Sequence, residues 1–247
     1  MPHSPSFRDV PGSDTAVLFV HGILGTPDHF SGLLPLIPES WSYANLLLPG
    51  HGGSVRDFAR ASMTLWRNAV TEQVDRLAHT HQRLFLVGHS MGTLFCINEA
   101  LRRSDKVAGL FLLAPPLYPM LTLTATRQSL QVSFGQKRST AALQAAYDAC
   151  SITHTKKLWQ YLGWIPRFTE LFQAARMARM EITELTVPVV AVHSQHDELV
   201  SRRSCRVLEN ADCATLHTLP SSGHFYYPPE DLATLQSLFQ AFIDTHT

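Results

Sequence analysis

Residues 83–92 read Arg83-Leu84-Phe85-Leu86-Val87-Gly88-His89-Ser90-Met91-Gly92, an apolar run that ends in the pattern Gly-x-Ser-x-Gly. The run has the composition of a strand buried on both faces, and a helical pattern begins at Met91. The pattern alone is weak, but a strand, a tight turn and a helix in this order hold the serine on a strained elbow. Side chains at Gly88 and Gly92 would collide with neighbouring backbone. This setting predicts that Ser90 is a nucleophile above a helix N-terminus, rather than a capping serine in a glycine-rich turn.

Short apolar segments on both sides of this elbow alternate with amphipathic segments. Such alternation predicts an α/β fold with a mostly parallel central sheet and helices on both faces. Strands are expected at Thr15–Val20, Tyr43–Leu48, Arg83–Val87, Val107–Leu113, Val187–His193 and Thr215–Leu219. Helices are expected at Asp28–Ile37, Met63–Thr80, Met91–Arg103, Arg203–Asn210 and Glu230–Thr245.

Residues 115–185 interrupt this alternation. They contain no convincing strand, but they include helical patterns at Ser139–Ala149 and Phe168–Met180 together with several aromatic residues. A segment of this length between two strands is seldom a plain loop. We therefore expect a core formed by residues 1–114 and 186–247 and a small inserted helical cap formed by residues 115–185. Longer crossover helices are the alternative.

The composition limits the partners of the chain. The 247 residues suit one α/β domain, and 20 Lys and Arg balance 20 Asp and Glu. A neutral chain has no electrostatic reason to bind nucleic acid or an anionic membrane. The N-terminus lacks the pattern of a secretory signal, and no apolar stretch is long enough for an integral membrane segment. We expect a cytoplasmic protein with reduced thiols, and the absence of a strongly basic amphipathic helix argues against a lipase held at a lipid surface.

The general base is expected on the loop after the last strand, because a serine hydroxyl is a poor nucleophile until a base takes its proton. Ser222-Gly223-His224 lies at that place, which favours His224 as the base over a simple surface histidine. The acid that orients it is expected after the preceding strand, where Asp197 is the first choice and the adjacent Glu198 its rival. The chain order Ser, Asp, His is the order of one of the three familiar triad lineages.

Two backbone N–H groups are needed to stabilise an oxyanion. One is predicted to belong to Met91, the residue after the nucleophile. The other is expected in the loop His21-Gly22-Ile23-Leu24-Gly25, with Ile23 the first choice and Leu24 the second.

The remaining polar residues have simpler interpretations. We expect His21, His51 and His89 to form structural hydrogen bonds rather than to act in catalysis. A metal site at His193, His196 and Asp197 is conceivable, but the triad already accounts for Asp197. The chain contains no H-E-x-x-H, no phosphate-loop motif and no G-x-G-x-x-G, so we expect neither a metal nor a cofactor.

The motifs 21–27, 48–52, 88–92, 196–198 and 222–224 together resemble those of bacterial carboxylesterases and monoacylglycerol lipases of the α/β-hydrolase superfamily. The resemblance covers nearly the whole chain. It implies cofactor-free hydrolysis of a small-molecule acyl ester through an acyl-Ser90 intermediate, with the cap forming an apolar acyl pocket. The expected substrates are short- to medium-chain acyl esters or monoacylglycerols.

Three alternatives stay open at this point. A feruloyl or cinnamoyl esterase shares much of the same motif pattern, and a thioesterase uses the same triad. A ligand-binding protein with this fold and little turnover is the alternative outside enzymes, because a fold does not determine function. The sequence does not determine the oligomeric state.

Overall fold

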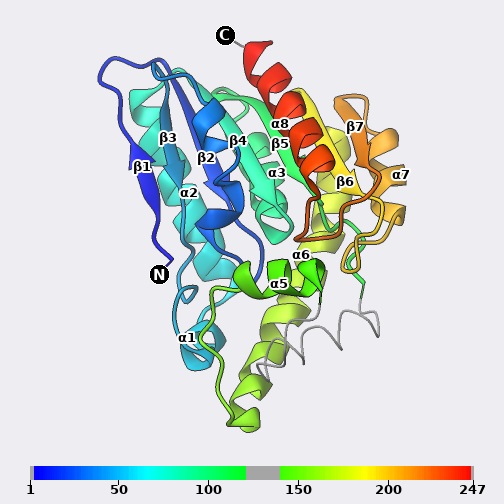
Figure 1. Cartoon of the computed structure of the whole chain (residues 1–247). Helices are drawn as coiled ribbons and strands as arrows, with labels where there is room; N and C mark the ends of the chain where they lie inside the picture. Colours follow the sequence, from blue (N-terminus) through cyan, green and yellow to red (C-terminus); the bar gives the residue numbers. More distant parts are fainter. Residues whose placement is uncertain (1–2, 121–139, 246–247) are drawn as a thin grey trace.

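The computed structural model describes residues 3–120 and 140–245. Its centre is a seven-stranded sheet with the strand order β1-β3-β2-β4-β5-β6-β7 (Figure 1). Strand β1 pairs with β3 in the antiparallel direction, and every other neighbouring pair is parallel. The strands are β1 (Ser6–Arg8), β2 (Thr15–Val20), β3 (Ser42–Asn45), β4 (Arg83–His89), β5 (Val107–Leu113), β6 (Val189–Ser194) and β7 (Ala214–Leu219). The predicted fold class, a mostly parallel sheet in an α/β fold, is confirmed.

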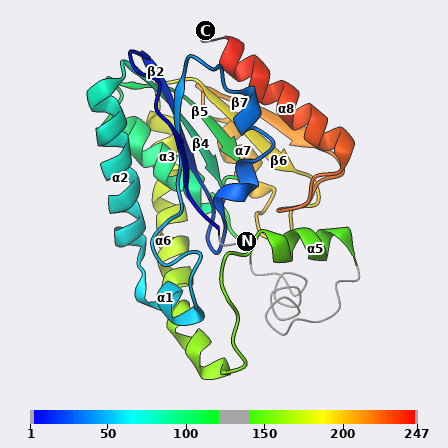
Figure 2. The same ribbon diagram turned by 60° about the vertical axis from the view of Figure 1, so that its left-hand side comes forward.

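Helices cover both faces of the sheet (Figures 1 and 2). One face packs against α2 (Met63–Thr80), α3 (Met91–Arg102), α6 (Ile165–Glu181) and α7 (Arg203–Glu209). The opposite face packs against α8 (Pro229–Asp244) and the 3₁₀ helices η1 (Pro27–Phe30) and η2 (Leu34–Leu36).

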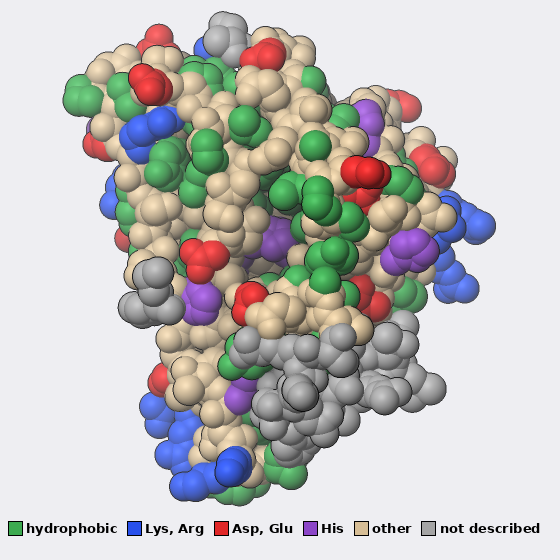
Figure 3. Space-filling view, in the orientation of Figure 1, with side chains coloured by type: hydrophobic (Ala, Val, Ile, Leu, Met, Phe, Trp, Pro, Cys, Tyr) green, Lys and Arg blue, Asp and Glu red, His purple; other side chains and the backbone are tan. Residues whose placement is uncertain are grey.

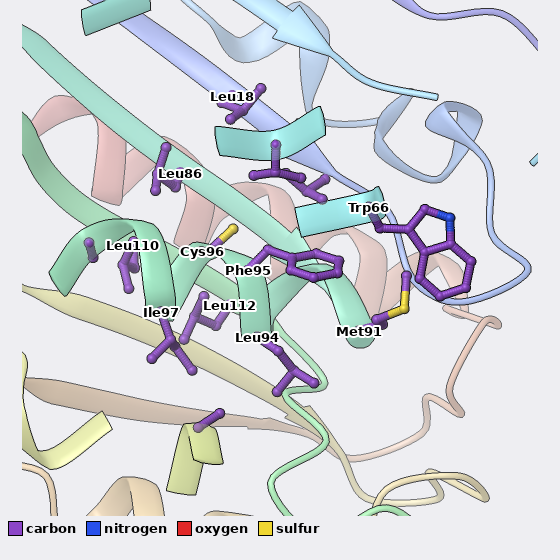
Figure 4. Close-up of a cluster of buried hydrophobic side chains, with 14 of the residues drawn as sticks. Leu18, Trp66, Leu86, Met91, Leu94, Phe95, Cys96, Ile97, Leu110 and Leu112 are labelled. Atoms are coloured by element: carbon purple, nitrogen blue, oxygen red, sulfur yellow. The ribbon is translucent and has the colours of Figure 1, made fainter. Parts of the chain in front are cut away.

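The strand residues alternate between these two cores, as the two-residue period of a strand requires. On β2, Leu18 packs in the first core, whereas Phe19 packs in the second. Figure 4 shows the first core, in which Leu86 and Leu112 from the sheet lie beside Phe95 and its neighbours on α3. Burial on both faces accounts for the continuous apolar runs in the sequence.

The structure differs from the sequence-based expectations at a few elements. The single helix predicted at Asp28–Ile37 is wrong, because the segment forms η1 and η2 instead. Pro35 has no N–H for a helical hydrogen bond and Gly32 disfavours helix, so a continuous helix is broken there. Strand β1 and helix α1 (Val55–Arg60) were not predicted, and both are short.

The described part of the long segment between β5 and β6 contains helices and turns but no strand. It contains α5 (Ala141–Asp148), η3 (Leu158–Trp164), α6 and η4 (Ile182–Glu184). The C-terminal part of α6 packs into the first core through Ala175 and Ala178. Residues 121–139, which belong to the predicted cap, lie outside the described residues.

Candidate active site

Ser90 lies on a strained turn between β4 and α3. Its backbone has φ +49° and ψ −123°, a conformation that costs energy for a residue with a side chain. A Cβ atom at Gly92 would stand 1.9 Å from the carbonyl oxygen of Val20, and one at Gly88 would stand 2.7 Å from Cα of Thr93. The two glycines are therefore required by close backbone approach, as the sequence predicted. The turn is fixed by hydrogen bonds from the N–H and Oγ1 of Thr93 to the carbonyl oxygen of Ser90.

Asp197 and His224 form a buried pair across two loops. Nδ1 of His224 lies 2.8 Å from Oδ2 of Asp197, and both side chains are at most 1% exposed. Oδ1 of Asp197 accepts the N–H groups of Leu199 and Val200 at 2.8 Å each. Both carboxylate oxygens of Asp197 thus take part in short hydrogen bonds, which hold the carboxylate in one orientation.

Burial and charge act in opposite directions on this pair. Burial alone would lower the pKa of His224, but the charge of Asp197 and its hydrogen bond outweigh burial, so the pKa is raised. Burial would raise the pKa of Asp197, but the interaction with His224 and the two backbone N–H groups lower it. The pair therefore favours an ionised carboxylate beside an imidazole that accepts a proton readily.

Glu198, the predicted rival of Asp197, has a different partner. Its Oε2 accepts the backbone N–H of His224 at 3.1 Å, while the imidazole points to Asp197. The charge of Glu198 also helps to raise the pKa of His224. The two neighbouring carboxylates therefore contact different parts of His224: Asp197 contacts its ring and Glu198 contacts its backbone N–H.

The loop that carries His224 is tied to its surroundings on both sides. Oδ2 of Asp231, at the start of α8, accepts the N–H of Ser221 at 2.8 Å and the hydroxyl of Ser222 at 2.6 Å. The N–H of His196 donates to the carbonyl oxygen of Ser222. These bonds couple the loop after β6 to the loop after β7, so that His224 is placed from both.

His89 connects the serine turn to the histidine loop. Its Nε2 lies 3.2 Å from the carbonyl oxygen of His224, and the two ring centroids are 4.8 Å apart. On its other side the ring of His89 stacks on His29 at 3.7 Å. Burial lowers the pKa of His89, so it is neutral at pH 7 and fits the structural role that was expected. His89, the residue before Ser90 in the chain, thus links the serine turn to the backbone of the loop that carries His224.

The loop after β2 lies directly against the serine. A Cβ atom at Gly22 would stand 2.9 Å from Cβ of Ser90, so only glycine allows this approach. Leu24 has φ +59°, and its N–H donates to Nε2 of His51 at 3.1 Å. The amide of Leu24, the second choice for the oxyanion, is therefore already engaged.

His21 and His51 support this loop as neutral acceptors. Nε2 of His21 accepts the N–H of Leu48, and its Nδ1 donates to the carbonyl oxygen of Gly22. Burial lowers the pKa of His21 to about 4 and also lowers the pKa of His51. Neutral rings are required here, because a protonated imidazole has no nitrogen that can accept a hydrogen bond.

The model of a family described as "alpha/beta hydrolase fold" matches residues 15–162, which is more than half of the chain. The chain belongs to the α/β-hydrolase fold family. The match contains the strand β2, the glycine-rich loop that follows it, and the serine turn.

Curated relatives of this α/β hydrolase are found in Neisseria meningitidis. A pimeloyl-[acyl-carrier protein] methyl ester esterase of serogroup B strain MC58 is 30% identical over 109 residues, or 43% of this chain and 39% of the relative. The protein of the same name from serogroup A strain Z2491 is 31% identical over 156 residues, or 63% of this chain and 45% of the relative. These matches span less than half of the relatives' own length.

Solved structures match this α/β hydrolase over almost its entire length. One is described in a study of LipS and LipT, two metagenome-derived lipolytic enzymes, with a TM-score of 0.76, 18% identity and coverage of 99% and 98% of the two chains. The monoacylglycerol lipase of Paleococcus ferrophilus has a TM-score of 0.71 at 17% identity and full coverage of both chains. Est1E of Butyrivibrio proteoclasticus, solved with ferulic acid, has a TM-score of 0.66 at 17% identity, covering 98% and 94%. At identities this low, these likenesses show the shared fold alone.

Three contacts of the α/β hydrolase at this place were not predicted from the sequence. They are Glu198 at the N–H of His224, Asp231 at the loop before it, and His51 at the N–H of Leu24. The sequence signal for His51 was its place in the glycine-rich segment 48–52, whereas the contacts of Asp231 have no local signature. Within residues 3–120 and 140–245, no group of three or more His, Cys, Asp or Glu is arranged to hold a metal ion.

Proposed function

We propose that this α/β hydrolase is a serine carboxylic-ester hydrolase with Ser90 as nucleophile, His224 as general base and Asp197 as the orienting acid. The observation that carries the proposal is the buried 2.8 Å contact between Nδ1 of His224 and Asp197, on loops that adjoin the strained serine turn. Strain at a nucleophilic residue and a buried acid–base pair beside it are typical of a catalytic site.

The proposed reaction begins when Oγ of Ser90 attacks the ester carbonyl carbon and Nε2 of His224 takes the hydroxyl proton. The carbonyl oxygen becomes an oxyanion. When the tetrahedral intermediate collapses, the alcohol leaves with the proton from His224, and the acyl group stays on Ser90. A water molecule then gives its proton to His224 and attacks the acyl-Ser90 ester, which releases the carboxylic acid and restores the serine.

We assign the oxyanion to the backbone N–H groups of Met91 and Ile23. Met91 is the first residue of α3, where a helix leaves its N–H groups without intrahelical acceptors. Ile23 is favoured over Leu24 because the Leu24 amide donates to His51. The approach of Gly22 to Ser90 places this loop at the serine.

Asp197 has two roles in the proposal. Its contact with Nδ1 directs the proton of neutral His224 to that nitrogen and leaves Nε2 free to accept the serine proton. Its charge also stabilises the imidazolium that forms during attack. Glu198 adds a second negative charge near the same imidazolium through the backbone N–H of His224.

For the substrate, we propose short- to medium-chain acyl esters or monoacylglycerols. Within the proposed cap, which the structure describes at residues 115–120 and 140–185, the N–H of Ser151 donates a hydrogen bond to the carbonyl oxygen of Leu24 on the proposed oxyanion loop. A lid at this position would enclose the acyl group. The names of similar proteins add methyl esters on acyl-carrier protein and, for Est1E, ferulic acid as further candidates.

The test is hydrolysis of p-nitrophenyl esters from acetate to palmitate, beside monoacylglycerols, methyl ferulate, fatty-acid methyl esters and acyl thioesters, by the wild type and Ser90→Ala. We expect activity that peaks at one acyl length and is lost in Ser90→Ala. A thioester or a feruloyl ester as the best substrate would replace the proposed substrate class and keep the mechanism. Absence of turnover on every substrate, together with tight ligand binding, would instead identify a binding protein.

A further inference from the structure

Four large apolar side chains of η3 and the first turn of α6 face solvent. The exposed fraction is 57% for Leu158, 60% for Trp159, 66% for Leu162 and 61% for Ile165. In a 3₁₀ helix, residues three apart lie above one another, so Trp159, Leu162 and Ile165 form one row. Single exposed apolar residues are ordinary, but a contiguous group marks an interaction surface. We call these four residues the apolar tip.

The inner side of the same helix is already packed. Nε1 of Trp164 donates to the carbonyl oxygen of Val55 on α1 at 3.0 Å, and its ring lies 5.0 Å from that of Phe58. A Cβ atom at Gly163 would stand 2.7 Å from Cβ of Ala59, so η3 and α1 are in close contact. The apolar tip is thus the outer face of a firmly seated helix, and the fold does not need it for its own core.

Basic side chains surround the apolar tip. Lys156 and Lys157 precede it, and Arg56 and Arg60 stand on the adjoining α1, all four exposed. The guanidinium of Arg56 lies over the ring of Trp159 at 5.3 Å from the ring centre. Asp57 is the one carboxylate residue within segments 55–60 and 155–166. The chain as a whole is neutral, so this end carries a local positive excess.

Figure 3 shows this excess at the lower end of the molecule, where Lys and Arg side chains gather beside exposed hydrophobic ones. The same end carries α1 in Figure 1. Apolar and basic groups are therefore presented together on one projecting part of the surface.

We propose that the apolar tip and its four cations bind the surface of an anionic lipid bilayer. An exposed Trp beside Leu and Ile, ringed by Lys and Arg, suits the boundary between acyl chains and headgroups. Each cation near an anionic leaflet adds to the attraction. Protein–protein interfaces, in contrast, are depleted in Lys, which favours lipid over a protein partner. No described helix is long and apolar enough to cross a membrane, so the binding is peripheral.

The position of the tip gives this binding a consequence for the candidate active site. The segment that leads to the tip is bonded to the loops at that site, through Ser151 to Leu24 and through the N–H of Thr153 to the carbonyl oxygen of Gly53. Docking would therefore bring the lipid to a segment that is hydrogen-bonded to the loops beside Ser90. This proposal runs against the expectation from composition, because a neutral net charge hides a surface whose cations come from two segments about a hundred residues apart.

Trp159 supplies a direct probe. Of the four tryptophans, Trp41, Trp66 and Trp164 are buried, whereas Trp159 is 60% exposed. The experiment mixes the full chain with vesicles of phosphatidylcholine alone, or with vesicles that also contain about 30 mol% phosphatidylglycerol, which makes their surface strongly anionic. We expect co-sedimentation with the anionic vesicles, weakened by salt, and a blue shift of tryptophan emission that brominated acyl chains quench.

Three variants test the assignment. Leu162→Asp is expected to abolish vesicle binding, and Lys156→Glu with Lys157→Glu to weaken it by about 30-fold or more, since each lost cation costs about fivefold. Met177→Asp, at an apolar residue 49% exposed on α6 outside the tip, is the matched control and keeps wild-type binding. Circular dichroism checks that all variants are folded.

The outcomes are decisive whether or not the chain hydrolyses esters. Ser90→Ala is expected to bind vesicles as the wild type does, so binding and catalysis are read separately. Failure of the wild type to bind anionic vesicles, or equal binding by Leu162→Asp and Met177→Asp, overturns the proposal. A dimer in light scattering that Leu162→Asp dissociates, without vesicle binding, would assign the tip to contact between two copies instead.

Discussion

The backbone N–H of Leu24 donates to Nε2 of His51 at 3.1 Å, although the two residues are 27 positions apart in the chain. This bond fixes the positive φ of Leu24 and with it the direction of the preceding peptide groups. Because the ring of His51 has to accept, its proton stays on Nδ1 and the ring stays neutral. The loop beside Ser90 therefore depends on an uncharged histidine that comes from the segment after β3.

We predict that His51→Ala lowers kcat of the proposed ester hydrolysis by about tenfold to 10²-fold with a smaller change in KM, since loss of a whole oxyanion donor costs about 10²–10³. His51→Gln is expected to recover part of the rate, because its amide oxygen can accept the N–H of Leu24. Steady-state kinetics on the best p-nitrophenyl ester measures both, with the exposed His79→Ala as control. An unchanged kcat in His51→Ala would remove His51 from the positioning of the loop.

For Asp197 we predict that Asn in its place reduces kcat by roughly 10⁴, because the amide no longer directs the proton of His224 to Nδ1. The side chain keeps its size and Oδ1 still faces the N–H groups of Leu199 and Val200. A variant with near-normal thermal stability but a strongly reduced kcat would therefore show that Asp197 acts in catalysis and not in folding. A variant that retains more than about a tenth of wild-type kcat would contradict the assignment of the orienting acid.

Glu198→Gln is predicted to move the pH profile without abolishing activity. The rate rises with pH as His224 loses its proton, and the raised pKa of His224 places this acid limb of kcat/KM above the ordinary value of 6.5. The charge of Glu198 contributes to that raise, so its removal shifts the limb to lower pH. Gln keeps an acceptor for the N–H of His224. A limb that stays in place, measured with Glu184→Gln as the surface control, would show that the charge of Glu198 has no effect on His224.

The fold could be predicted from the sequence because it depends on local patterns, and local patterns also selected the candidate site residues, whose roles stay a proposal. The strand at Val107–Leu113 and the helix at Met63–Thr80 were predicted with the bounds that the structure has. The Gly-x-Ser-x-Gly pattern predicts a tight, strained turn, and in the structure Gly92 can approach Val20 only because it has no side chain. The contact of Asp197 with His224 follows from two loops at neighbouring parallel strands, whose carboxyl ends lie at one edge of the sheet.

Features that depend on packing between distant segments could not be predicted in the same way. The choice between Asp197 and Glu198 is made by side-chain direction, which two adjacent carboxylates do not encode in their spacing. The amide of Leu24 is occupied by His51 only after β2 and β3 have paired. The bounds of the inserted cap, the acyl preference and the cytoplasmic location stay predictions.

Replacement of Gly92 by Ala is predicted to destabilise the fold by several kcal/mol, on the order of 2–5. The new Cβ atom would stand 1.9 Å from a backbone oxygen of β2, which cannot move without shifting the central sheet. Gly32→Ala is the matched control, because its Cβ atom would meet only side-chain atoms at 3.6 Å and beyond. Urea denaturation compares the two variants, and equal midpoints would show that α3 can withdraw from β2 at little cost.

Because several buried histidines are neutral in the folded protein, we predict that the free energy of unfolding falls in mild acid. Burial lowers the pKa of His21 to about 4 and that of His29 to about 3, and it also lowers the pKa of His51 and His89. In the unfolded chain these histidines take up protons below the ordinary histidine pKa of about 6.5, whereas in the folded chain they do not. The stability that they contribute is therefore present above pH 6.5 and is lost as the pH falls. His224 acts in the opposite sense, because a raised pKa gives stability below 6.5 that is lost as the pH rises through the folded value.

The histidines with a lowered pKa outnumber His224, so we expect the free energy of unfolding, and with it the urea midpoint, to fall steadily from pH 6.5 toward pH 4. The free energy falls by at most about 1.4 kcal/mol per pH unit for each histidine. His29→Asn removes one of these groups at a ring whose Nε2 is buried and has no hydrogen-bond partner among the described residues, so the slope should become shallower whatever the stability at pH 7. His79→Asn, at an exposed histidine, should leave the slope unchanged. Parallel slopes for the wild type and His29→Asn would mean that the folded protein protonates His29 as readily as the unfolded chain does.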